Sequence, residues 1–83
     1  MPSIKYYGIV GGKVRRIVEQ MPANLGTLRD GIKWLADKYH LNMEEIETGY
    51  LIIMDSLVVH SIDEAPPMQP DSKIRIITVV YGG

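Results

Sequence analysis

The chain has 83 residues, enough for one domain and too few for two. Apolar residues make up 46% of it and charged residues 23%, a balance typical of a globular domain and not of a disordered tail or a fibre. Nine basic residues, ten acidic residues and no cysteine argue against a nucleic-acid or membrane partner, a disulfide framework and a cysteine-based metal site.

The first two expected elements form a β-hairpin. Residues 4–10 are rich in aromatic and β-branched side chains, and residues 13–19 resume that pattern after Gly11 and Gly12. Two glycines accept the positive φ angles that a tight hairpin turn demands. Gly8, inside the first run, indicates either a bulge or a close approach of another part of the chain.

A helix is predicted to begin after Thr27. Thr27 and Asp30 have the spacing of a capping box, in which side chains satisfy otherwise unpaired amide groups. Trp34 lies off the apolar stripe of this helix, so we expect it either beneath a loop or at a partner surface. The residues of the stripe recur at helical spacing and are Leu28, Ile32, Leu35, Ala36 and Tyr39.

Three further strands are predicted after an acidic connection at residues 42–48. Residues 50–54 and 57–59 flank a second tight turn, and residues 73–81 are the most β-branched run in the chain. A long loop containing three prolines separates the last two strands. The expected fold class is α+β, with a single domain over residues 1–83 in which one main helix packs on a mixed sheet of four to five strands. The last strand is expected inside the sheet.

No set of side chains in the sequence points to catalysis. His40 and His60 lack metal-ligand spacing, and the acidic residues 44–47 are typical of a solvated connection. We therefore expect no bound metal or cofactor and no enzymatic activity of the chain alone. The start of the chain lacks the basic patch and apolar run of a signal peptide, so a cytoplasmic location is expected.

The reactive group indicated by the sequence is its own end, where a strand-like run leads into Gly82 and Gly83. Two residues without Cβ atoms can pass through a channel too narrow for side chains. Together with residues 28–39, 51–59 and 74–83, this ending resembles the MoaD/ThiS family of ubiquitin-like sulfur carriers. The resemblance implies a two-layer β-grasp domain with a flexible tail at residues 82–83.

The resemblance also implies a chemistry for Gly83. An E1-like adenylating enzyme would activate its carboxylate with ATP, a sulfur donor would convert it to a thiocarboxylate, and an acceptor enzyme would take the sulfur for cofactor biosynthesis. The acceptor would be the large subunit of molybdopterin synthase or thiazole synthase, and chain length favours molybdopterin over the thiamine thiazole pathway. The chain would then be a protein co-substrate. The alternative is a ubiquitin-like modifier or a β-grasp interaction module without sulfur transfer.

A docking surface is expected on the sheet, because one helix covers only one face whereas the strands carry apolar residues on both. Exposed apolar patches often mark interfaces. The expected partner-binding residues are Ile77, Val79 and Tyr81, with Tyr50 or Ile52 beside them. For Ile52, burial beneath a loop is the equal alternative.

Overall fold

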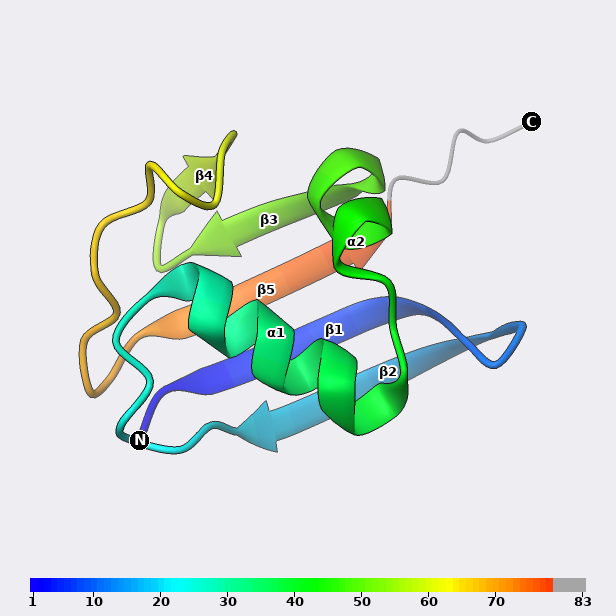
Figure 1. Ribbon diagram of the computed structural model, residues 1–83, viewed down its shortest axis with the longest axis horizontal. Helices are drawn as coiled ribbons and strands as arrows, with labels where there is room; N and C mark the ends of the chain where they lie inside the picture. Colours follow the sequence, from blue (N-terminus) through cyan, green and yellow to red (C-terminus); the bar gives the residue numbers. More distant parts are fainter. Residues whose placement is uncertain (79–83) are drawn as a thin grey trace.

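The protein is built around one mixed sheet of five strands in the order β2-β1-β5-β3-β4 (Figure 1). The computed structural model describes residues 1–78. Strand β5 is parallel to β1 and antiparallel to β3, so it lies inside the sheet as expected. In chain order the elements are β1 (Ser3–Val10), β2 (Lys13–Gln20), α1 (Leu28–Tyr39), α2 (Met43–Gly49), β3 (Tyr50–Met54), β4 (Leu57–Val59) and β5 (Lys73–Thr78). The predicted α+β class is confirmed.

The first hairpin and the main helix follow the sequence patterns closely. Gly11 and Gly12 have φ angles of 60° and 81°, which the tight turn between β1 and β2 requires. Helix α1 begins after Thr27, whose hydroxyl accepts the N–H of Asp30 at 3.1 Å. Trp34 is half-buried against the core, and the Lys38 ammonium lies 5.1 Å from the centre of its ring.

Helix α2 occupies the segment that the sequence indicates only as an acidic connection between α1 and β3. The side chain of Asn42 caps it by accepting the N–H of Glu45 at 3.2 Å. Glu44 and Glu45 lie in its first turn, where negative charge is favourable beside the unpaired amides. Ile46 is its one buried residue, so the sequence contains no apolar stripe that would have predicted the helix.

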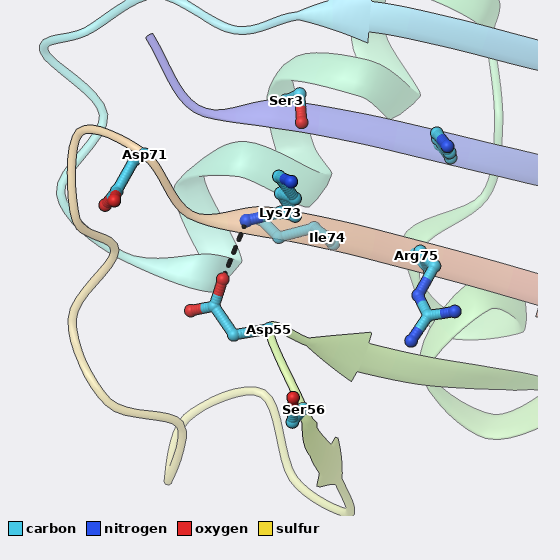
Figure 2. A pocket seen from close by; sticks show the side chains of 8 residues that line it. Ser3, Asp55, Ser56, Asp71, Lys73, Ile74 and Arg75 are labelled. Atoms are coloured by element: carbon cyan, nitrogen blue, oxygen red, sulfur yellow. Dashed lines mark hydrogen bonds between the residues drawn. The ribbon is translucent and has the colours of Figure 1, made fainter.

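The second tight turn joins β3 to β4 and is tied to the start of β5. Asp55 adopts a left-handed conformation with φ 58°, which aspartate tolerates better than most residues. Its N–H donates to the carbonyl of Lys73 at 2.8 Å, and its carboxylate accepts the N–H of Lys73 at 3.0 Å (Figure 2). Aspartate therefore fulfils here the role of the glycine that a tight turn usually requires.

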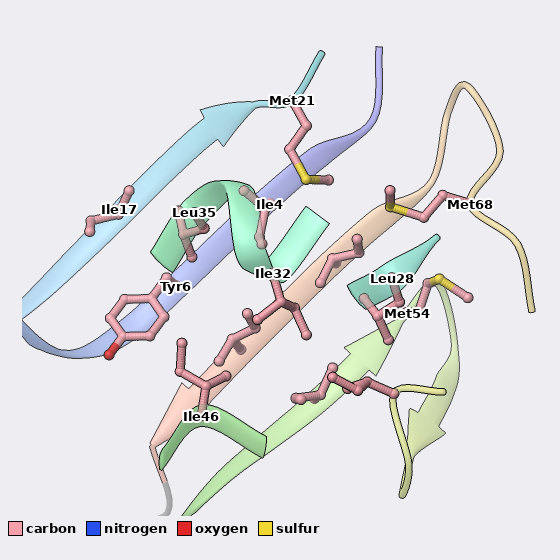
Figure 3. Close-up of a cluster of buried hydrophobic side chains, with 14 residues drawn as sticks. Ile4, Tyr6, Ile17, Met21, Leu28, Ile32, Leu35, Ile46, Met54 and Met68 are labelled. Carbon is pink, nitrogen blue, oxygen red and sulfur yellow. The ribbon is translucent and has the colours of Figure 1, made fainter. Parts of the chain in front are cut away.

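One hydrophobic cluster fills the space between the sheet and the two helices (Figure 3). Full burial of a large apolar side chain contributes about 1.5–3 kcal/mol, so this cluster is the main source of stability. No helix within residues 1–78 is long and apolar enough to cross a membrane. The cluster consists of Ile4, Tyr6, Ile17, Met21, Leu28, Ile32, Leu35, Ile46, Ile52, Met54, Ile62, Met68, Ile74 and Ile76.

Candidate functional site

The predicted reactive residues, Gly82 and Gly83, lie outside the described residues, as do Val79 and Tyr81. The structure does place the strand that precedes them in the sequence. Strand β5 pairs with β1 on one side as far as Ile77 and with β3 on the other as far as Thr78. A central strand paired on both sides is a fixed support for whatever continues from its end.

Two stacked tyrosines hold the neighbouring strands together near the end of β5. The rings of Tyr6 and Tyr50 have centroids 5.5 Å apart, and their hydroxyl oxygens lie 2.9 Å apart. The N–H of Ile9 donates to the Tyr50 hydroxyl at 3.3 Å. Tyr50 pairs with Thr78 across the ladder. The tyrosine pair therefore links β1 to β3 beside the last described residue of β5.

Alkaline unfolding tests this tyrosine contact. Burial and the hydrogen bond to Tyr50 raise the pKa of Tyr6 well above that of an ordinary tyrosine. Because folded Tyr6 holds its proton more tightly than the unfolded residue, its contribution to stability is complete below the unfolded pKa of about 10 and is lost as the pH rises above it. We expect Tyr6→Phe to lower the free energy of unfolding by about 1 kcal/mol at neutral pH.

The Tyr6→Phe variant should also lose stability less steeply than the wild type above the unfolded tyrosine pKa, as measured by denaturant unfolding at a series of alkaline pH values. The other four tyrosines are present in both proteins, so the difference between the two curves reports the hydrogen-bonded contact of Tyr6 with Tyr50. Parallel curves would show that Tyr6 ionises as freely as an exposed tyrosine.

The structure separates the expected docking residues onto two faces of the sheet. Antiparallel pairing places Leu51 opposite Ile77, so Tyr50 and Ile52 point to the face that the helices cover. Ile52 is 2% exposed and belongs to the core, which corrects its expected contact with a partner in favour of burial, beneath the helices instead of a loop. Tyr50 is half-buried and occupied by its contact with Tyr6. Neither side chain lies beside Ile77.

The face that the helices leave uncovered, which we call the outer face, has a row of apolar side chains at its centre. Tyr7, Ile77 and Leu51 are direct neighbours across β1, β5 and β3. Tyr7 is 47% exposed and Leu51 38% exposed, while Ile77 between them is half-buried. Further exposed apolar side chains on this face are Ile9, Val14, Val18 and Val58. Only Ile77 of this row was among the expected docking residues.

The outer face is hollowed in two adjoining places. A hollow of about 150 Å³ lies between β1 and β5 and is bordered by Tyr7 and Ile77, with Lys5, Arg16 and Arg75 around it. A wider groove of about 500 Å³ runs from Lys5 and Arg75 toward the turn at Asp55 (Figure 2). Both openings therefore combine apolar surface with basic side chains.

Comparison with known proteins does not assign the chain to a family. No model of a protein family matches it, and no curated protein matches its sequence. Within residues 1–78, no group of three or more acidic or histidine side chains is arranged to hold a metal ion. The functional interpretation therefore rests on three features of the molecule itself: the Gly82-Gly83 ending of the sequence, strand β5 that leads to it, and the outer face beside that strand.

Proposed function

We propose that this chain is a β-grasp sulfur carrier whose working group is the carboxylate of Gly83. The observation that carries the proposal is the position of β5, a central strand whose sequence continues through residues 79–81 into Gly82 and Gly83. The mixed sheet with a helix packed on one face is consistent with the β-grasp fold that the resemblance to sulfur carriers implies. The proposal requires that Gly83 bears a free carboxylate in the mature protein.

The chemistry proceeds in two steps that the partners of the chain catalyse. A carboxylate oxygen of Gly83 attacks the α-phosphorus of ATP, pyrophosphate leaves, and a mixed anhydride with AMP forms. A sulfur nucleophile at the oxidation level of hydrosulfide then attacks the carbonyl carbon, and AMP leaves as the carbon–sulfur bond forms. The resulting thiocarboxylate is a better nucleophile than the carboxylate and passes its sulfur to an acceptor enzyme.

The body of the protein acts in this proposal as a rigid handle. Strand β5 is held on both sides, and the Tyr6–Tyr50 contact fixes its neighbours close to Thr78. Glycines at the tip need little width and accept backbone angles that other residues avoid, which suits entry into a remote active site. The acceptor proposed first is the large subunit of molybdopterin synthase, with thiazole synthase as the second candidate.

Intact-protein mass spectrometry tests the proposal. The purified chain is incubated with ATP, an E1-like adenylating enzyme from the same genome and a hydrosulfide source. We expect one oxygen to be replaced by sulfur, and fragmentation to locate the sulfur at Gly83. Isopeptide conjugates between Gly83 and lysines of other proteins would instead support a ubiquitin-like modifier. If neither product forms, the proposal of an activated terminus is wrong.

A further inference from the structure

The outer face of the sheet has basic and apolar strand side chains, and none of those in the described strands is acidic. Its outward strand positions include the basic residues Lys5, Arg16, Lys73 and Arg75. Glu19 is the one acidic residue in the described strands, and it has the opposite parity because it pairs with the buried Ile4. The whole chain has more acidic than basic residues, so this face differs in sign from the rest of the molecule.

The cations around the central hollow form no ion pair with the part of the chain that the structure describes. Within residues 1–78, the ion pairs involve Arg29, Lys33 and Lys38, and none involves Lys5, Arg16 or Arg75. Asp55 and Asp71 border the wider groove, which Lys5 and Arg75 also line, but neither borders the central hollow. The carboxylate of Asp55 is already engaged by the N–H of Lys73 (Figure 2). The hollow between Tyr7 and Ile77 is thus apolar at its centre and positive around its rim.

We propose that the outer face binds a protein partner through a segment in which carboxylate side chains flank a bulky apolar side chain. The apolar side chain fills the hollow between Tyr7 and Ile77, and the carboxylates pair with Lys5, Arg16 and Arg75. Complementary charge of this kind increases the association rate and suppresses wrong partners. The inference concerns binding alone, so it stands or falls independently of sulfur loading at Gly83.

Other occupants of this face fit its chemistry less well. A second copy of the chain, bound face to face, would bring the same four cations against one another. A single-stranded nucleic acid needs several aromatic rings for stacking, whereas Tyr7 is the one ring on the outer face of the described strands. The net charge of -1 also gives no long-range field for phosphates. An acidic protein segment is the occupant that both charge and shape favour.

Selection from a random peptide display library tests the inference, because it reports the chemistry of a partner without requiring that the partner be known. We expect the enriched peptides to have an excess of Asp and Glu next to Leu, Ile or Phe. Fluorescence anisotropy should show that Arg16→Glu weakens binding of these peptides by about 10-fold or more. Binding should also weaken as the salt concentration rises, because the cations lie at the surface.

Arg15→Glu is the matched control. Arg15 is the same residue type one position earlier in β2, is also exposed, and points to the opposite face of the sheet. The Arg15→Glu substitution should leave peptide binding unchanged, and thermal melts should show that the Arg15→Glu and Arg16→Glu variants both fold. Arg75→Gln provides a second variant on the outer face, with an expected loss in the same direction. The inference is overturned if the library yields no acidic binders, if Arg15→Glu and Arg16→Glu weaken binding equally, or if single-stranded oligonucleotides or self-association occupy the face instead.

Discussion

Deletion of Gly82 and Gly83 should abolish sulfur loading completely and leave thermal unfolding unchanged. The reacting carbonyl carbon is lost, and no other carboxylate of the chain is expected to reach the adenylating site in the same way. Stability should persist because the two glycines have no side chains to contribute to the core, and the core members among residues 1–78 lie between Ile4 and Ile76. The measurements are intact-protein mass spectrometry after reaction and thermal unfolding followed by circular dichroism.

Two companion variants separate the carboxylate from the shape of the tip. Addition of one alanine after Gly83 keeps both glycines and moves the carboxylate onto a residue with a Cβ, so loading should still be lost. Gly82→Ala keeps the carboxylate at Gly83 and widens the stalk, so it should reduce loading by a smaller factor. Normal loading of the deletion variant would place the activated group elsewhere and refute the proposed function.

The elements with strong local signals could be predicted from the sequence. A Gly-Gly pair between two strand-like runs predicts a tight turn with positive φ angles, and Gly11 and Gly12 have such angles. The apolar stripe of α1 predicts both the helix and its buried face, and Leu28, Ile32, Leu35 and Ala36 are all buried. Each of these patterns involves residues close together in the sequence, so it can be interpreted without knowledge of the tertiary structure.

The candidate site was less predictable because it depends on pairing between distant strands. Whether Tyr50 or Leu51 lies beside Ile77 is decided by the register of β3 against β5, and a shift of one residue exchanges the faces. The basic rim of the outer face has the same origin, since Lys5, Arg16 and Arg75 come from three strands. The helix α2 had a local signal, the capping pattern from Asn42 to Glu45, but only one buried residue to support it.

Gly8 had two interpretations in the sequence, and the fold decides between them. The pairing of β1 with β2 continues through Gly8 opposite Arg15, so there is no bulge. A Cβ at this position would overlap the ring of Tyr50 and lie 2.9 Å from Cζ of Tyr6. Close approach of the two tyrosines is therefore the reason for the glycine. We expect Gly8→Ala to lower the free energy of unfolding by about 1–3 kcal/mol, measured by urea denaturation.

A double-mutant cycle with Tyr50→Ala tests whether the ring causes that loss. The φ angle of Gly8 lies outside the left-handed region, so alanine causes no backbone strain at this position. Only contacts between its Cβ and the tyrosine side chains oppose the substitution. In the Tyr50→Ala background the one close contact left is with Cζ of Tyr6 at 2.9 Å, so Gly8→Ala should cost clearly less free energy of unfolding than it does in the wild type. Gly26→Ala is the control, since a Cβ there meets no atom within 4 Å.

A coupling energy of about 1–3 kcal/mol between positions 8 and 50 would show that the Tyr50 ring is held firmly over β1. Because Tyr50 pairs with Thr78, the same result would show that β3 is locked beside the end of β5, where the proposed carrier needs a rigid support. Additive effects would mean that the ring of Tyr50 swings away from Gly8 at little cost. In that case the tyrosine contact would not fix the strand from which the Gly82-Gly83 segment continues.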